Sequence, residues 1–282
     1  MGRILAIAIW FITVASLWMF LSHRWWFPEA ISEHGPRVDS QFAITILVCG
    51  IAFAAAQIGL GWTVWKYRDS ADKQRATYSH GNNRLEVVWT IVTAVVFISL
   101  AVMGQRVWAS LHLHAAPANA YRIEVVAQQF DWNFHYPGKD NLLGRTKPEM
   151  IDDATNPVGL DEADPNAKDD AQVKTLVVPA NRPVELILES KDVTHSFWVP
   201  QLRFKQDLVP GMAIHVHFTA NKVGKYELAC AELCGMNHFK MKSYMLVLPE
   251  NEFDELTALP NDKGQFLTRK DQLLAKYPLP TY

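Results

Sequence analysis

Long apolar stretches separated by short polar segments dominate the first third of the chain. Residues 4–21, 42–65 and 87–105 each run for 18 to 24 residues without a charged side chain. A helix of about 20 apolar residues is long enough to cross the hydrocarbon core of a bilayer. The pattern therefore predicts three transmembrane helices within residues 1–110, and no stretch of this length follows Arg106.

The first apolar stretch has two interpretations, because a secretory signal peptide also begins with a basic residue and an apolar core. Here Arg3 precedes the stretch, and residues 22–27 (Ser-His-Arg-Trp-Trp-Phe) follow it without a small-x-small cleavage site. We therefore expect a retained helical anchor. Cleavage of the stretch as a signal peptide stays the alternative.

Basic residues in the short loops predict the orientation in the membrane, because cytoplasmic loops carry an excess of Lys and Arg. The loop between the second and third stretches holds five such residues, whereas the loop between the first and second holds two. These are Lys66, Arg68, Lys73, Arg75 and Arg84 against Arg24 and Arg37. We expect a multi-pass protein of the bacterial inner (plasma) membrane, with the chain after Arg106 on the outer, periplasmic side.

The hydrophobic period changes to two after the third stretch, which is typical of β-strands. The predicted strands cover residues 122–128, 173–178, 183–190 and 214–218. Pro, Gly and Asn are concentrated between them, so residues 121–249 are expected to form an all-β sandwich or barrel. Residues 250–282 are expected to form a short helix and a loosely held tail.

One segment inside this region, residues 137–172, shows no periodicity and is rich in acidic residues. These are Asp152, Asp153, Asp161, Glu162, Asp164, Asp169 and Asp170, interspersed with Pro, Gly, Asn and Ala. We interpret the segment as an excursion from the β scaffold. It is either a solvated loop or an acidic docking face for a basic partner.

Composition narrows the class of protein further. The chain has 282 residues, with 27 basic and 29 acidic side chains, a formal net charge of −2, and 49% hydrophobic residues. This composition excludes a disordered chain and a polycation, so nucleic acid is not expected as a partner. Only six of the charged residues lie in the first 65 positions, which is the segregation expected of a membrane-anchored protein.

Two of the three cysteines belong to a cluster of metal-binding residue types. Cys49 stands alone in the second apolar stretch, where a thiol is most often a packing group. Cys230, Cys234, His238 and Met241 fall within twelve residues, and His195 supplies a further imidazole upstream. Thiolate, thioether and imidazole donors favour copper or zinc over calcium or magnesium.

These donors leave three arrangements open. The cysteines form a disulfide, which leaves His238 and Met241 unexplained; or two cysteines and two histidines form a structural zinc site. The third arrangement is a pair of copper ions that share both sulfurs. The thioether of Met241 favours copper over zinc, and a single blue copper ion needs only one thiolate, so the copper pair accounts for the most donors.

The run Cys-x-Glu-x-Cys-x3-His-x2-Met at 230–241, with the upstream Val-Thr-His-Ser-Phe-Trp at 193–198, resembles subunit II of the haem-copper cytochrome c oxidases. The resemblance covers residues from about 41 to 249. It implies a cupredoxin-like barrel that holds the dinuclear copper centre called CuA. The implied ligands are the bridging Cys230 and Cys234, one copper each for His195 and His238, weakly bound Met241, and the backbone carbonyl of Glu232.

The resemblance also implies a function for the whole chain. It would be the subunit of a terminal respiratory oxidase that receives electrons from cytochrome c and passes them to haem in subunit I. Oxygen reduction and proton translocation would occur in that partner, so no catalytic residue is expected in this chain. The other implied partners are further oxidase subunits and the lipid bilayer, and the Glu232 carboxylate would help to bind magnesium at the border with subunit I.

Functions of other classes remain as alternatives. A membrane-anchored copper chaperone would use the same donors without a redox partner, but exposed and flexible cysteines suit that role better. A zinc-stabilised module is the structural alternative. A quinol oxidase subunit is disfavoured, because that branch of the family resembles this chain but lacks the metal ligands.

Six further residues carry weaker predictions. Phe130 stands where the family has the first Trp of its Gln-Trp-x-Trp segment, and Trp132 matches the second. Both are candidates for electron uptake, and strand packing is the alternative. Glu86, with Asn83 as N-cap, fits a capping box at the start of the third helix. The resemblance adds a role for Glu86 in proton uptake towards subunit I. Phe197, Trp198 and Phe239 are expected to shield the metal centre from water.

Overall fold

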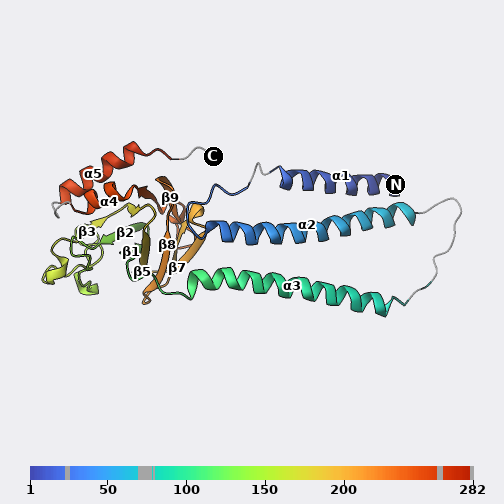
Figure 1. Cartoon of the computed structure of the whole chain (residues 1–282), viewed down its shortest axis with the longest axis horizontal. Helices are drawn as coiled ribbons and strands as arrows, with labels where there is room; N and C mark the ends of the chain where they lie inside the picture. The colour runs from blue at the N-terminus through green and yellow to red at the C-terminus, as the bar shows by residue number, and fades with distance from the viewer. Residues whose placement is uncertain (23–25, 69–77, 79, 259–262, 280–282) are drawn as a thin grey trace. The chain divides into compact units, whose positions relative to one another are not determined.

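The computed structural model describes residues 1–22, 26–68, 78, 80–258 and 263–279. The first part holds three long helices, α1 (Gly2–Leu21), α2 (Gly35–Lys66) and α3 (Asn83–His112) (Figure 1). Each is long and apolar enough to cross a membrane, which confirms the three predicted helices. The helices extend beyond the uncharged stretches, because the polar residues that flank those stretches continue the helical turns.

Two of these helices, α1 and α2, pack against each other through a large side chain and a glycine. A Cβ atom at Gly61 of α2 would lie only 2.3 Å from Nε1 of Trp10 in α1. The same indole nitrogen donates a hydrogen bond to the carbonyl of Ile58 at 3.4 Å, and the ring stacks on Trp65 with 6.0 Å between centroids. Helices in a membrane associate through close packing of this kind, because the hydrophobic effect does not drive their association in lipid.

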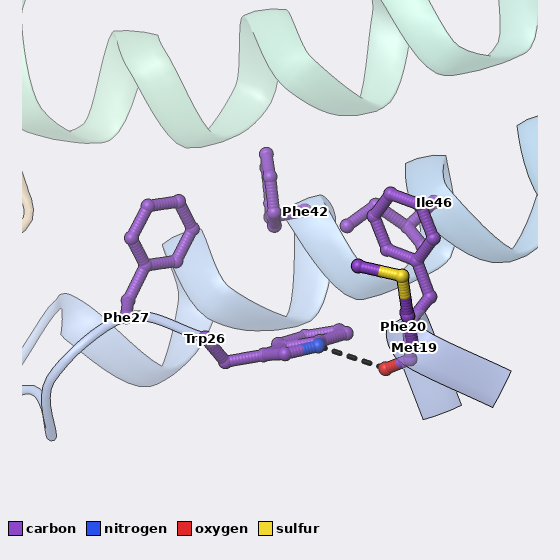
Figure 2. A pocket seen from close by; sticks show the side chains of 6 residues that line it. All are labelled: Met19, Phe20, Trp26, Phe27, Phe42 and Ile46. Atoms are coloured by element: carbon purple, nitrogen blue, oxygen red, sulfur yellow. Dashed lines mark hydrogen bonds between the residues drawn. The ribbon is translucent and has the colours of Figure 1, made fainter. Parts of the chain in front are cut away.

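An apolar pocket lies between the end of α1 and the start of α2 (Figure 2). Its lining is Met19, Phe20, Trp26, Phe27, Phe42 and Ile46. The indole nitrogen of Trp26 donates to the carbonyl of Phe20 at 2.9 Å, so the polar atom of that side chain is satisfied at the helix end. The remaining surface is apolar, as is expected of residues that contact hydrocarbon or another membrane helix.

The second part of the chain is built from two five-stranded sheets, which confirms the predicted all-β class. One sheet has the order β3-β2-β1-β5-β8, and the other has the order β4-β10-β9-β6-β7. In chain order the strands are β1 (Tyr121–Gln128), β2 (Asp131–Tyr136), β3 (Ala171–Val173), β4 (Leu176–Pro179), β5 (Pro183–Ser190), β6 (His195–Val199), β7 (Phe204–Leu208), β8 (Ile214–Thr219), β9 (Gly224–Cys230) and β10 (Lys242–Leu248).

One predicted strand is wrong in its extent. The β-branched run at 173–178 is divided, with Val173 ending β3 in the first sheet and Leu176 opening β4 in the second. Two residues carry the chain from one sheet to the other, and a continuous apolar run cannot reveal that change. The prediction for 183–190 matches β5, where Val184, Leu186 and Leu188 are all fully buried.

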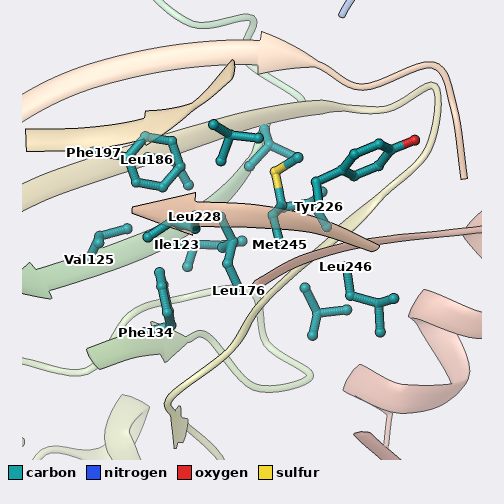
Figure 3. Close-up of a cluster of buried hydrophobic side chains, with 14 of the residues drawn as sticks. Ile123, Val125, Phe134, Leu176, Leu186, Phe197, Tyr226, Leu228, Met245 and Leu246 are labelled. Atoms are coloured by element: carbon teal, nitrogen blue, oxygen red, sulfur yellow. The ribbon is translucent and has the colours of Figure 1, made fainter. Parts of the chain in front are cut away.

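The core lies between the two sheets (Figure 3). Leu186 and Ile123 come from the first sheet, and Leu228 and Met245 come from the second. All four are fully buried, and each contributes roughly 1.5–3 kcal/mol of burial free energy. Because the two sheets pack tightly on this core, the ends of their strands are held in fixed positions.

The segment between α1 and α2 contributes to this β domain. Pro28–Pro36 belongs to the same compact unit as Ala109–Tyr282. Ile31 is buried in the core, its backbone nitrogen donates to the carbonyl of Gln201 at 2.9 Å, and its carbonyl accepts from Asn221 at 2.7 Å. The chain after α1 and the chain after α3 therefore fold together, a relation that a division of the sequence near residue 110 does not reveal.

The acidic excursion, residues 137–172, is a folded part of the domain. It has 3-10 turns at Pro148–Met150 and Pro165–Ala167, and its buried Val158, Leu160 and Ala167 form a small apolar cluster with Val126 of β1. Asp161 and Asp170 are buried, whereas Asp152, Asp153 and Glu162 are exposed. The interpretation of the whole segment as solvated is therefore wrong for its two buried carboxylates.

A buried imidazole fastens this excursion to the first sheet. The ring nitrogens of His135 in β2 lie 2.6 Å from Glu124 of β1 and 2.6 Å from Asp170 at the end of the excursion. Asp170 also accepts hydrogen bonds from the backbone nitrogens of Gly138 at 3.2 Å and Gly144 at 2.7 Å. One carboxylate thus joins both ends of the segment.

Two helices follow the last strand, α4 (Glu250–Thr257) and α5 (Lys263–Lys276). Phe253 and Leu256 of α4 are buried in the core, as is Leu273 of α5. The prediction of a short helix fits α4, but the prediction of a loosely held tail is wrong for the second helix, because Leu273 anchors it to the core.

Candidate metal centre

Three strand ends bring the predicted ligands together. Cys230 is the last residue of β9, and Met241 immediately precedes β10, so the ligand loop 231–241 connects two paired strands. The backbone nitrogen of Cys230 donates to the carbonyl of Met241 at 3.1 Å and closes the base of the loop. β6 pairs with β9 so that Phe197 faces Cys230, and this register carries His195 to the sulfurs.

The donor atoms converge on the pair of sulfurs. Sγ of Cys230 lies 3.8 Å from Sγ of Cys234 and 3.9 Å from Nδ1 of His195. Sγ of Cys234 lies 3.5 Å from Nδ1 of His238 and 3.8 Å from Sδ of Met241. The carbonyl oxygen of Glu232 lies 3.1 Å from Sγ of Cys230. All six predicted ligands therefore meet in one place.

The two histidines occupy different sides of the sulfur pair. The donor atoms of His195, Cys230 and Cys234 lie within 4.8 Å of one another, and His238 is outside this group although it touches Cys234. A single tetrahedral zinc ion would bring all four ligands to within about 4 Å of one another. The sulfurs of Cys230 and Cys234 are free thiols 3.8 Å apart, so these two cysteines do not form the disulfide that was one of the alternatives.

The centre is largely shielded from water. His195, Cys230, Cys234 and Met241 are all buried, and His238 is partly exposed. Phe197 is buried beside the site, as predicted. Trp198 and Phe239 are exposed, so the prediction that they shield the metal is wrong, because Trp198 points to the outer face of β6 and Phe239 lies at the tip of the loop.

The two thiols differ in acidity. Burial disfavours the Cys230 thiolate, but the hydrogen bond with the His195 ring and backbone hydrogen bonds outweigh it and hold the pKa of Cys230 below its ordinary value. Burial and then the neighbouring Cys230 thiolate raise the pKa of Cys234. Both protons must leave before a metal binds, so loading is expected to depend on pH.

The electron-uptake candidates differ in burial, with Phe130 in the β1–β2 turn and Trp132 in β2. Phe130 is half-buried and lies against the ligand loop, where a Cβ at Gly235 would be 3.0 Å from Cζ of its ring. Trp132 is fully buried, and its indole nitrogen lies 3.5 Å from the carbonyl of Met241. Only Phe130 therefore presents a surface that a docked protein can touch.

Glu86 lies in the first turn of α3 and is exposed. The cap is Asn82 rather than Asn83, because the Oδ1 atom of Asn82 accepts from the backbone nitrogens of Arg84 at 3.1 Å and Leu85 at 3.2 Å. The helix therefore begins at Asn83, one residue earlier than a cap at Asn83 requires.

Comparisons with known proteins agree with this geometry. The family model described as "Cytochrome C oxidase subunit II, periplasmic domain" matches residues 121–248, and the corresponding transmembrane-domain model matches residues 22–107. The "Alternative cytochrome c oxidase subunit 2" of Bradyrhizobium diazoefficiens is 31% identical over 250 residues, which cover 88% of each chain. The chain belongs to the cytochrome c oxidase subunit II family. It is therefore part of an oxidoreductase complex.

Other relatives extend this picture. The cytochrome c oxidase subunit 2 of Synechocystis is 30% identical over 293 residues, covering 88% of this chain and 79% of the relative. A crystal structure of the periplasmic domain of subunit II of cytochrome oxidase from Bradyrhizobium japonicum is 22% identical, with a TM-score of 0.36, covering 56% of this chain and 99% of that chain. As a family member, this subunit has a membrane part of three apolar helices followed by a cupredoxin-like β domain.

Two contacts of the centre were missed in the sequence. Asp192 accepts a hydrogen bond from Nε2 of His195 at 2.8 Å, and Gln129 donates from its side chain to the carbonyl of Cys234. A carboxylate three residues before a candidate histidine ligand is a usable signal, because ligand histidines commonly donate their second nitrogen to a carboxylate. Gln129 had no such signal, since its partner is a backbone atom 105 positions away.

Proposed function

We propose that the metal centre of this subunit is a dinuclear CuA site, and that the subunit receives electrons from cytochrome c and delivers them to haem in subunit I. The observation that carries the proposal is the convergence of two thiols, two imidazoles, a thioether and a carbonyl on one sulfur pair. Membership of the subunit II family supports the same assignment. The oxygen chemistry and proton translocation belong to the partner.

Different ligand residues would bind each of the two copper ions. Cys230 and Cys234 would both be ligands to the two ions, because each sulfur has an imidazole beside it. Glu232 supplies a carbonyl beside Cys230, and Met241 supplies a thioether beside Cys234. When bound, a copper pair of this kind carries one electron with little change in bonding. The paired strands hold the loop ends, and burial excludes water from the sulfurs.

The burial of the donors argues against a copper chaperone. A chaperone gives up its metal to another protein, and for this its sulfurs must be reachable. Here Cys230 and Cys234 are 8% and 4% exposed, and His195 is fully buried. Met241 argues against zinc. Its thioether is buried and turned towards Cys234, where it can serve as a ligand, and zinc rarely accepts a thioether.

We infer a docking site for the electron donor around Phe130 and the acidic excursion. Phe130 is the partly exposed aromatic residue next to the ligand loop. The exposed carboxylates of Asp152, Asp153 and Glu162 are suited to a donor with a basic surface. Trp132, which is fully buried, would serve as packing behind Met241 rather than as the contact residue.

The proposed orientation places the β domain on the outer, periplasmic side of the inner membrane. Lys66, Arg68 and Arg84 flank the loop between α2 and α3 and support its cytoplasmic location. Lys73, Arg75 and Arg24, which entered the same comparison, lie outside the described residues. Glu86, exposed in the first turn of α3, would then lie at the cytoplasmic end of that helix, where a role in proton uptake towards subunit I stays a prediction.

A magnesium ion at the border with subunit I is also a proposal. The carboxylate of Glu232 is half-exposed, while its carbonyl is turned towards Cys230. Nζ of Lys205 lies 3.7 Å from this carboxylate and 2.6 Å from Asp207. An ammonium group competes with a divalent cation, so a bound magnesium ion would have to displace Lys205 or be held chiefly by the partner.

The proposed function is tested by mixing reduced cytochrome c with the copper-loaded, full-length chain in detergent. We expect oxidation of cytochrome c in step with reduction of the copper centre, up to one electron per chain. Cys234→Ser removes a shared ligand and should abolish both changes. Electron transfer that persists in Cys234→Ser, or its absence in the copper-loaded wild type, would contradict the proposal.

A further inference from the structure

A turn far from the ligand loop in sequence fastens two of the ligands to each other. The turn between β1 and β2 holds Gln129, whose backbone nitrogen donates to Oδ2 of Asp192 at 2.7 Å. The side-chain nitrogen of Gln129 donates to the carbonyl of Cys234. Asp192 accepts in turn from Nε2 of His195 at 2.8 Å. The path from His195 to Cys234 therefore runs through Asp192 and Gln129 without a metal ion.

The position of Asp192 determines which nitrogen of His195 faces the sulfurs. Nε2 donates to the carboxylate, so Nδ1 is left on the side of Cys230, 3.9 Å from its sulfur. The backbone nitrogen of Val193 donates to the same carboxylate at 2.7 Å, so the carboxylate is itself held in place.

The ligand loop is shaped to receive the β1–β2 turn. Gly235, next to Cys234, has a φ of +139°, which other residues rarely adopt. A Cβ at this position would lie 2.8 Å from the side-chain nitrogen of Gln129 and 3.0 Å from the ring of Phe130. The missing side chain thus allows both residues of the turn to lie directly on the loop.

The two candidate histidine ligands differ in how firmly the surrounding chain holds them. His195 is fully buried and held by Asp192, whereas His238 is partly exposed and has its described contact at Cys234. One half of the centre is therefore fixed by the β scaffold, and the other depends on the loop. The bond from Gln129 joins the loop to the fixed half at Cys234 itself, whereas Trp132 and Lys205 contact the loop at Met241 and Glu232.

We propose that Asp192 and Gln129 are a positioning pair, which fixes His195 and the ligand loop relative to each other and thereby sets the geometry of the metal centre. This proposal rests on the proposed function, because the geometry has a purpose only if the centre holds copper. Neither residue is proposed as a ligand. The pair also joins the metal centre to the turn that carries Phe130, so the proposed donor-docking surface and the ligands share one rigid connection.

The test uses the full-length chain in detergent, loaded with copper, and measures two properties. These are copper retention against a competing chelator and the electron paramagnetic resonance spectrum of the loaded centre. Asp192→Ala should lower copper affinity by about 10–100-fold, the usual effect of losing a partner behind a metal ligand, and should change the copper hyperfine splitting. Asp192→Asn keeps an oxygen that accepts from His195, so it should recover part of both properties. Gln129→Leu should change them in the same direction by a smaller amount.

Glu227→Gln is the matched control, because it changes a carboxylate to an amide on β9 while its described contact is with Lys242. This variant should behave as the wild type. A wild-type spectrum and affinity in Asp192→Ala would overturn the positioning pair, as would a change confined to the melting temperature of the copper-free chain. If Asp192→Ala does not fold, unchanged spectra in both Asp192→Asn and Gln129→Leu would overturn it. A wild type that binds no copper pair would instead overturn the proposed function, and this inference with it.

Discussion

His135 gives the β domain a stability that depends on pH. Its imidazole is fully buried between Glu124 and Asp170. Burial alone would lower the pKa of His135, but hydrogen bonds to the two carboxylates outweigh it and raise the pKa from 6.5 to about 9. At 1.36 kcal/mol for each pKa unit, the gap corresponds to about 3 kcal/mol of folding free energy. Because the folded chain holds this proton more tightly, the stabilisation is complete below pH 6.5 and is lost as the pH rises through 9.

The assay is urea unfolding of the full-length chain in detergent, followed by near-ultraviolet circular dichroism of the β domain at a series of pH values. The loss of stability between pH 6 and a pH above 9 should be about 3 kcal/mol larger in the wild type than in His135→Gln, because other groups, such as Cys230, titrate in both chains. His135→Gln cannot titrate at this position, so it should be less stable at pH 6 and lack this additional loss. His215→Gln controls for the substitution, because His215 is an exposed histidine that also contacts a carboxylate. The same loss of stability in His135→Gln as in the wild type would refute the reasoning.

Four further predictions concern the donor, the core and the membrane part. Phe130→Ala should slow electron transfer from cytochrome c by about tenfold without changing copper content, as stopped-flow measurements with metal analysis would reveal. Transfer should also slow steeply with ionic strength, and a flat response would exclude the acidic docking face. Trp132→Ala should cost about 3–5 kcal/mol in urea unfolding, because the ring is fully buried. Gly61→Leu should lower the melting temperature in detergent, whereas Gly59→Leu, where space is open, should not; equal effects would exclude the packing of Trp10 on Gly61.

The membrane helices and the ligand set could be predicted from the sequence because their signals are local. An uncharged run of about 20 residues identifies a helix without knowledge of its neighbours. The residues from Cys230 to Met241 are close in the chain, so their convergence needs only one loop. His195 is distant, but its residue type and the family motif together single it out.

Other features depend on contacts between distant segments. The division of residues 173–178 between two sheets depends on which strands β3 and β4 pair with, and the apolar run is the same in either case. Leu273 anchors α5 because its side chain packs into the core between distant segments of the chain. Asp170 has a charged side chain in an acidic segment, which suggested a position exposed to solvent. This side chain is instead buried beside His135, a pairing across 35 positions that no local pattern reveals.

The supports of the metal centre were hidden for the same reason. Gln129 reaches a backbone carbonyl on the ligand loop, and backbone atoms carry no residue-specific signal. The contribution of Ile31 to the β core was equally hidden, because it lies in a short link between two membrane helices. Sequence patterns thus predicted the ligands, whereas the residues that hold them became visible only in the folded chain.

The most direct test of the account is the metal content of the full-length chain, purified from membranes, together with its electron paramagnetic resonance spectrum. Two copper ions per chain are expected, with the hyperfine splitting of one unpaired electron shared by two copper nuclei. One copper ion with the splitting of a single nucleus, or zinc in place of copper, would contradict the assignment of Cys230 and Cys234 as shared ligands.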